Sequence, residues 1–300
     1  MFQKIKDFLD YFRYIKNPIE ALKFKFGLIN SCNLKIKDID YEITLHHVSS
    51  IDKLMNLIPI VSKKKIFEFL KCIEDIDTDK EYIVVNGINF INIQNSNFIK
   101  NKKHEYIIHL NEFFTDDEWS MIDFKNRHVI DVGSNIGDTP LYFAKKGARV
   151  IGFEPVKHLH ELGLKNLQIN EKLSERIILV NKGVGGKRGT LTYQSNSVQG
   201  YTDENSYEME IISMQDLLND YDFTPDILKM DCEGCEFEVI LNNDLTMFND
   251  IIFEHHSKNT GKDYKPLIEK LKKEGFEINK YPVTVSRQDF DDIGIIHAYK

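Results

Sequence analysis

The sequence of 300 residues has no uninterrupted apolar run of the roughly 18 residues that a membrane-spanning helix needs. Its amino terminus also lacks the apolar core and the cleavage site of a signal peptide. No internal repeat is visible, and no Pro-, Ser- or Gly-rich linker divides the chain. These absences predict a cytoplasmic protein without a transmembrane segment.

Cysteine is scarce, because only Cys32, Cys72, Cys232 and Cys235 occur, and so few scattered cysteines exclude a disulfide framework. Cys232 and Cys235 form a C-x-x-C. A structural zinc site would need a second ligand pair, and a thioredoxin-like pair would stand at an early helix start without acids between its cysteines. We therefore expect these two cysteines to act as small residues that fill space.

A basic excess is also missing, since 39 Lys and Arg stand against 47 Asp and Glu, for a net charge of -8 without long single-sign blocks. A dedicated nucleic-acid surface is therefore disfavoured. The 42% hydrophobic and 29% charged residues are typical of globular proteins, and the length suggests roughly two units.

Residues 1–104 carry no chemical motif and predict a smaller α+β region that sets substrate choice or assembly. Apolar residues recur at helical spacing over 2–16. We expect this stripe to pack against its own domain, with contact to a membrane surface or a partner as the alternative. Further expected elements are helices over 18–22, 51–57 (capped by Ser49 or Ser50) and 64–73 (capped by Ser62), and strands over 34–45 and 81–93 with a turn at Asn86-Gly87.

From residue 105 to 300 the pattern alternates between strand and helix, which indicates a parallel sheet covered by helices. The expected strands are 129–132, 149–153, 177–181, 227–230 and 251–253, followed by 276–281 and 293–299 as an antiparallel edge. A loop over 183–186 and two strand-rich segments, 189–193 and 207–213, are expected between the third and fourth of these strands. The expected helices are 139–146, 157–169, 214–218 and 265–273, with stops at Gly147 and Gly275.

A glycine turn, Gly133-x-x-x-Gly137, follows the first of these strands and opens a helix. Such a turn lets the backbone approach a ligand closely, and the helix start offers unpaired N–H groups. The dinucleotide fingerprint G-x-G-x-x-G is absent, because Asn135 stands where its second glycine would be. Asp131 at the strand end would repel a phosphate but suits an amino group, and S-adenosylmethionine carries one.

The strand ends carry Asp131, Glu154, Asp231 and Glu254-His255, which should converge on one rim of the sheet. Glu154 lies 23 positions after Asp131 (154 minus 131). This is close to the roughly 20-residue spacing at which an acid binds the two hydroxyls of a ribose. A nucleoside-containing cofactor is therefore expected at this rim.

Three segments carry a family resemblance: V-I-D-V-G-S-N-I-G-D-T over 129–139, G-F-E-P over 152–155, and L-K-M-D-C-E-G-C-E over 228–236. Together they resemble the FkbM family of S-adenosylmethionine-dependent methyltransferases, over about residues 105–280. The resemblance implies an α/β fold with a Rossmann-like, seven-stranded class I methyltransferase sheet and helices on both faces. Cys232 and Cys235 depart from the aliphatic or small residues usual in that family.

The resemblance also implies the residues that hold S-adenosylmethionine. They are Glu112, Asp131, Gly133, Ser134, Asn135, Gly137, Thr139, Glu154, Pro155, Gly183, Val184 and Asp231. Trp119 would be the aromatic residue that accompanies Glu112, and Asn166 and Asn170 match asparagines of the helix after the ribose acid.

Methyl transfer to a hydroxyl needs an aligned acceptor and a base that removes its proton. The candidate catalytic residues are Asp231, Glu233 and His255 or His256, with Asp231 favoured. Lys229 lies on the same side of its strand as Asp231 and would hold a carboxylate charged or form a structural pair. The expected reaction is O-methylation of a sugar, a glycan or a small natural product.

Three alternatives remain open. Residues 231, 233, 254 and 255 could bind a divalent cation, although we favour a reaction without a metal because spacing alone does not establish coordination geometry. The protein could keep the fold as a non-catalytic S-adenosylmethionine-binding or assembly protein. It could also methylate nucleic acid, which the net charge disfavours.

Overall fold

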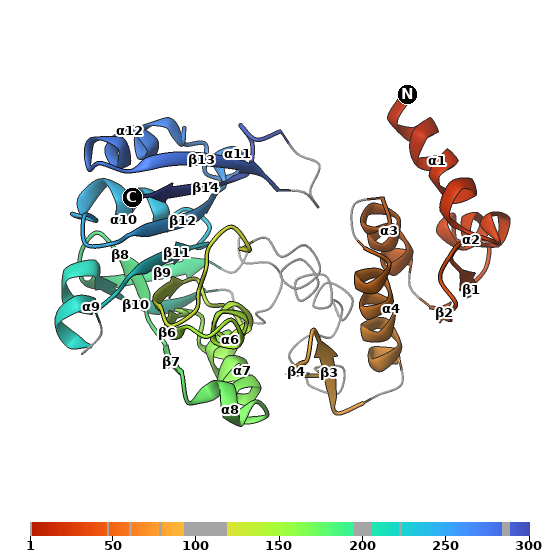
Figure 1. The fold of residues 1–300 in the computed structure, drawn as a ribbon, viewed down its shortest axis with the longest axis horizontal. Coiled ribbons are helices and arrows are strands. Elements are labelled where there is room, and N and C mark those ends of the chain that lie inside the picture. Colours follow the sequence, from red (N-terminus) through yellow and green to blue (C-terminus); the bar gives the residue numbers. More distant parts are fainter. Residues whose placement is uncertain are drawn as a thin grey trace. The chain divides into compact units, whose positions relative to one another are not determined.

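The computed structural model describes residues 2–46, 48–59, 62–77, 80–92, 119–194, 206–221, 224–283 and 289–300 (Figure 1). The chain divides into two compact units, Met1–Asp117 and Glu118–Lys300. We predicted a boundary near residue 104, and this residue lies in the segment 93–118, outside the described residues. No helix in the described ranges is both long enough and apolar enough to cross a membrane.

The first unit combines helices with two antiparallel hairpins. Its elements are α1 Phe2–Tyr14, α2 Pro18–Lys25, β1 Cys32–Lys35, β2 Glu42–Leu45, α3 Val48–Leu57, α4 Lys63–Asp77, β3 Tyr82–Val85 and β4 Ile88–Ile91. Asn86 and Gly87 have φ angles of 48° and 72°, as the predicted two-residue turn requires. The α+β character predicted for this region is confirmed.

Serine plays different roles at the starts of α3 and α4. Ser62 accepts a hydrogen bond from the backbone N–H of Lys65 at 3.3 Å, which confirms it as the cap of α4. The predicted cap of α3 is wrong, because this helix already begins at Val48 and contains both Ser49 and Ser50.

The apolar stripe of α1 is only partly covered. Ile15, which follows the helix, and Tyr11 are buried, whereas Phe8, Leu9 and Phe12 expose 45%, 57% and 43% of their surface. We expected the whole stripe to pack against its own domain, but three of its residues, Phe8, Leu9 and Phe12, are exposed. The rings of Phe8 and Phe12 contact each other instead, with centroids 5.4 Å apart.

The second unit contains the expected alternation of strands and helices. Its elements are β5 His128–Val132, α6 Asp138–Lys145, β6 Arg149–Phe153, α7 Lys157–Gln168, α8 Glu171–Ser174, β7 Ile177–Val180, β8 Gly183–Gly185, β9 Gly189–Gln194, β10 Ser206–Ser213, α9 Met214–Asp220, β11 Ile227–Met230, α10 Cys235–Asn242, β12 Asp250–His255, α11 Ser257–Thr260, α12 Lys265–Lys273, β13 Glu277–Pro282 and β14 Gly294–Tyr299. Gly147 and Gly275 follow α6 and α12 with φ angles of 101° and 91°, as helix-ending glycines do.

Seven strands form the main sheet in the order β13-β14-β12-β11-β5-β6-β7. Neighbours from β12 to β7 run parallel, and β14 is antiparallel to both β12 and β13. The strand order reverses between β5 and β11, because β6 and β7 extend the sheet on one side of β5 and β11 and β12 on the other. The predicted seven-stranded class I methyltransferase architecture is confirmed.

The last two strands pair antiparallel at one end of the main sheet, as predicted. β14 lies inside the sheet, and only β13 is an edge strand. Five of the six β14 residues are buried, whereas no β13 residue is. A nearly continuous apolar run, G-I-I-H-A-Y, is typical of an interior strand, which explains the difference.

Helices cover both faces of the sheet. Crossovers between parallel strands are right-handed, so helices that connect strands in opposite directions from β5 lie on opposite faces. α6 connects β5 to β6, and α7 lies in the connection from β6 to β7. α10 connects β11 to β12, on the other side of β5. Figure 1 shows α6, α7 and α8 grouped together, apart from α10 and α12.

A second, three-stranded sheet has the order β8-β10-β9. The sequence predicts strands for β9 and β10 but a loop at 183–186, and the structure corrects the latter, because Gly183–Gly185 pairs in parallel with β10. A Cβ at Gly183 would lie 2.6 Å from Ile211 Cδ1. Glycine at this position therefore leaves room for the Ile211 side chain.

The turn after β5 is held by its neighbours on both sides. The N–H groups of Gly133 and Ser134 donate to Phe153 O at 2.9 and 3.0 Å. Gly133 has a φ of 79°, and a Cβ there would lie 2.0 Å from the backbone oxygen of Asp231. Only glycine allows the ends of β5 and β11 to come this close.

We predict that Gly133→Ala destabilises the second unit by about 1 to 3 kcal/mol more than Gly275→Ala does. Both glycines have a positive φ, but a Cβ at Gly275 meets nothing within 4 Å. The measurement is urea unfolding followed by fluorescence of the single tryptophan, Trp119, which belongs to this unit. Equal losses in the two variants would contradict the proposed clash with Asp231.

Candidate functional site

The predicted cofactor loop contains buried polar atoms without a protein partner. Among the described residues, Ser134 Oγ, Asn135 Oδ1 and both carboxylate oxygens of Asp138 are buried and make no hydrogen bond. Buried polar groups are normally satisfied, so a set of four such atoms in one loop indicates a ligand that supplies the partners. These residues therefore fit a cofactor with polar substituents.

Glu154 stands at the end of β6, beside this loop, and its side chain is largely buried. Its two carboxylate oxygens accept hydrogen bonds from the backbone N–H groups of Asn135 at 2.9 Å and Val156 at 2.8 Å. Each oxygen keeps a further acceptor site, so the carboxylate can still bind two hydroxyls. Burial raises the pKa of Glu154 to about 8, although the two N–H groups oppose the shift.

Asparagines hold the surroundings of Glu154 in place. Asn181 donates to the backbone oxygens of Glu154 and Pro155 at 2.9 and 3.1 Å. Asn166 donates to Ile136 O in the glycine turn at 2.9 Å, and Asn170 donates to Asn166 O at 2.7 Å. These side chains therefore support the backbone of the site. Gly183 and Val184, predicted among the residues that hold the cofactor, are buried in β8.

Asp131 and Lys229 form an ion pair in the centre of the sheet. They are direct partners in the register of β5 and β11. Lys229 Nζ lies 2.9 Å from Asp131 Oδ1, and both side chains are completely buried. Lys229 also donates to Gly133 O at 3.0 Å, and Thr139 Oγ1 donates to Asp131 Oδ2 at 2.5 Å. The pair therefore connects two strands, the glycine turn and the start of α6.

The charges of this pair are set by burial and by the neighbouring acids. Burial raises the pKa of Asp131, while the Lys229 ammonium and the Thr139 hydroxyl oppose the shift. Burial alone would lower the pKa of Lys229, but Asp131 and Asp231 raise it above its usual value. Lys229 therefore remains charged, with its ammonium 5.5 Å from the ring centroid of buried Trp119.

The role predicted for Asp131, to face the amino group of the cofactor, stays a prediction. Its carboxylate already has an ammonium partner inside the protein. Asp138, which the sequence analysis missed, is completely buried, and burial raises its pKa to about 7. The signal was available, because Asp138 is an acid at the start of the helix that follows the glycine turn. Glu112 lies outside the described residues.

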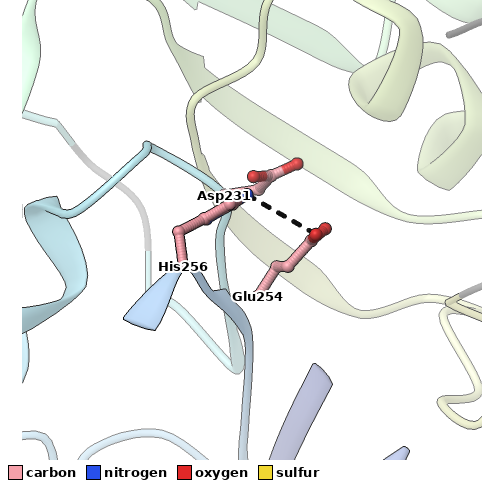
Figure 2. A group of neighbouring side chains, drawn as sticks. All are labelled: Asp231, Glu254 and His256. Atoms are coloured by element: carbon pink, nitrogen blue, oxygen red, sulfur yellow. Dashed lines mark ion pairs between the residues drawn. The ribbon is translucent and has the colours of Figure 1, made fainter. Parts of the chain in front are cut away.

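Two of the predicted rim residues, Asp231 and Glu254, meet beyond the carboxyl ends of β11 and β12 together with His256. Met230 and Phe253 are partners in the register of β11 and β12, so Asp231 and Glu254 follow side by side. Together with His256 they offer three ligand atoms within 4.8 Å of one another. Figure 2 shows the three side chains turned toward one another, with His256 paired to Glu254.

The two neighbouring histidines have different surroundings. His255 is completely buried, and its ring stacks on Tyr264 with centroids 4.3 Å apart. Burial lowers the pKa of His255 to about 4, so it stays neutral. His256 instead lies 3.5 Å from Glu254 and 3.6 Å from Glu233. A catalytic role for His255 stays a prediction, but His256 is the histidine that joins Asp231.

The C-x-x-C segment is a disulfide, which corrects our expectation of two unlinked space-filling cysteines. Glu233 and Gly234 between them have φ angles of 57° and 122°, and this tight turn brings Cys232 and Cys235 together at the start of α10. Glu236, in the first turn of α10, accepts a hydrogen bond from Cys232 N at 2.9 Å. The turn therefore fixes the chain directly after Asp231.

We predict that Lys229→Met lowers the free energy of unfolding of the second unit by about 3 to 5 kcal/mol, because Asp131 stays buried without its cation. The double variant Asp131→Asn with Lys229→Met should recover most of this loss. Urea unfolding monitored by Trp119 fluorescence measures both.

The matched control is Lys182→Met, which removes a partly exposed lysine paired with Glu210 at 2.7 Å. This variant should change stability little. If the double variant were as unstable as Lys229→Met alone, the loss would not come from an uncompensated Asp131.

Comparison with known proteins identifies the domain. Residues 131–278 match the family model described as the Methyltransferase FkbM domain. Methyltransferase sdnD of Sordaria araneosa is 28% identical over 170 residues, covering 43% of this chain and 65% of that protein. A tRNA (uracil(54)-C(5))-methyltransferase of Pyrococcus furiosus is 28% identical over 88 residues, which cover 27% of this chain and 21% of that protein. The chain thus spans less than two thirds of the length of these curated relatives.

Among solved structures, Methyltransferase FkbM from Methylobacillus flagellatus KT is 13% identical, with a TM-score of 0.45, and the comparison covers 84% of this chain and 59% of that one. The global similarity is low, so the assignment rests on the domain match. Residues 131–278 therefore form an FkbM domain, the domain of a family of S-adenosylmethionine-dependent methyltransferases.

Proposed function

We propose that this protein transfers the methyl group of S-adenosylmethionine to a hydroxyl oxygen of a sugar, a glycan or a small molecule. The observation that carries the proposal is the pairing of two features on one rim of the sheet. The cofactor loop has buried atoms without partners, and the ends of β11 and β12 carry a cluster of acids and a histidine beside it.

The cofactor supplies a methyl group on a positively charged sulfur. A new oxygen–carbon bond forms while the carbon–sulfur bond breaks, and the bonding electron pair stays on sulfur. The protein has to align the hydroxyl with the methyl carbon and accept the hydroxyl proton. Asp231 is our first candidate for the proton acceptor, with Glu233 and His256 beside it.

The same geometry supports a set of contacts to the cofactor. Glu154 would bind the two ribose hydroxyls through the acceptor sites that its backbone contacts leave open. Ser134, Asn135 and Asp138 would take the polar groups of the amino acid end, because their side-chain oxygens have no partner in the described residues. Pro155, Gly183 and Val184 would line the base.

Methylation of nucleic acid is the second candidate, favoured by the matches to archaeal tRNA methyltransferases. Those matches are short, covering 27% and 22% of this chain. The net charge of -8 opposes binding to a phosphate backbone. We therefore favour methylation of a hydroxyl on an uncharged or small acceptor over methylation of nucleic acid.

We predict that the protein, incubated with methyl-labelled S-adenosylmethionine and a host extract, labels a nuclease-resistant product that mass spectrometry identifies as a methyl ether. Asp231→Asn should reduce transfer by about 100-fold or more through loss of the base. Glu238→Gln, a change at an exposed acid on α10, is the control. A nuclease-sensitive product would favour the second candidate instead, and cofactor binding without any transfer would favour a binding protein.

We predict that affinity for S-adenosylmethionine rises with pH between about 6 and 8. In the free protein the pKa of Glu154 is raised to about 8, so this side chain must first lose its own proton before it accepts hydrogen bonds from two hydroxyls. Below pH 8 the affinity should fall up to about tenfold per pH unit, and it should level off above. Calorimetry of the wild type and of Glu154→Gln measures this, and an equal pH dependence in both would exclude Glu154 as the cause.

A further inference from the structure

The histidine in the rim cluster is buried without good hydrogen bonds. The side chain of His256 is 7% exposed, and its Nδ1 has no hydrogen-bond partner. The other ring nitrogen, Nε2, lies 3.5 Å from Glu254 and 3.6 Å from Glu233. Charge-assisted hydrogen bonds between nitrogen and a carboxylate are about 2.7 to 2.9 Å long. His256 Nε2 therefore faces two carboxylates at distances longer than those of such hydrogen bonds.

The spacing is that of ligands around one cation. Two ligand atoms about 2.1 Å from the same ion, and about 90 to 110° apart, are about 3.0 to 3.4 Å from each other. His256 Nε2 and Glu254 are 3.5 Å apart, and the atoms of Asp231, Glu254 and His256 all lie within 4.8 Å. Small rotations of these side chains would bring all three to bonding distance.

The backbone explains why the three donors meet. Asp231 and Glu254 follow partner residues of adjacent parallel strands, so both stand at the same edge of the sheet. His256 comes two positions after Glu254, so both side chains emerge on the same side of the chain. His255 between them points into the aromatic pocket of Tyr264 and Phe290. The donor set is therefore fixed by strand register and alternation.

We propose that Asp231, Glu254 and His256 bind a divalent cation, and that its open coordination positions hold the acceptor hydroxyl. Two carboxylates and one imidazole suit a first-row ion such as Mn²⁺. Three protein ligands leave room for further ligands, as in catalytic metal sites. The role at the acceptor rests on the function proposed above, whereas the cation site itself does not.

This assignment changes the proposed chemistry in one respect. The bound hydroxyl loses its proton to solvent because the cation lowers its pKa, and the resulting oxyanion attacks the methyl carbon. The oxygen–carbon bond then forms as the carbon–sulfur bond breaks, with the electron pair left on sulfur. Asp231 serves as a ligand in this arrangement rather than as the base.

The test is calorimetric titration of metal-free protein with Mn²⁺, in the absence of cofactor and acceptor. We expect one saturable site per chain, and at least about tenfold weaker binding in each of Glu254→Gln and His256→Gln. Glu238→Gln also removes one negative charge, from an exposed acid of α10, and should bind Mn²⁺ like the wild type. Circular dichroism checks that the variants are folded.

A second readout uses thermal unfolding followed by Trp119 fluorescence. Bound Mn²⁺ should raise the unfolding temperature of the wild type and of Glu238→Gln by mass action, and have little effect on the other two variants. No saturable binding to the wild type, or equal binding to all four proteins, would overturn the proposal. Mn²⁺ binding without methyl transfer would leave the cation site standing and count against the proposed function alone.

Discussion

The buried ion pair between Asp131 and Lys229 is the interaction on which the site depends. It joins the two strands at the point where the strand order of the sheet reverses. Through Gly133 O and Thr139 it also fixes the turn and the helix start that would cradle the cofactor. A buried charge pair contributes little net stability but makes wrong arrangements costly. In this protein the ion pair favours a single register between β5 and β11.

Much of this arrangement could be predicted from the sequence, because it follows from local patterns. Apolar runs that end in an acid located the carboxyl ends of the central strands, and the glycine turn and Glu154 followed from spacing. The partner of Lys229 could not be predicted, because register between strands that are distant in the chain is a tertiary property. The disulfide depended on the positive φ angles of Glu233 and Gly234, which the sequence does not reveal. His256 could have been preferred to His255, since alternation puts it on the side of Glu254.

The charge of the site has a consequence for the order of binding and release. Buried acids at positions 131, 138, 154 and 236 surround the loop and the rim, whereas Lys229 is a single buried cation among the described residues. Above a pH of about 8, where Asp138, Glu154 and Glu236 have lost their protons, such surroundings favour a positively charged ligand over a neutral one. Under the proposed function the cofactor carries a sulfonium charge that the demethylated product lacks. The protein would therefore hold the reactant more tightly than the product.

The position of β14 also bears on how the chain folds during synthesis. β13 reaches the sheet only through β14, which the ribosome makes later. Until β14 pairs with β12, the side of β12 that faces away from β11 is an unpaired strand edge, and such edges invite pairing with other chains. Residues 277–282 can join the sheet only after the strand that follows them in the chain has been made. At this end of the sheet, the strand that is synthesised last therefore pairs with β12 before or together with the strand that precedes it.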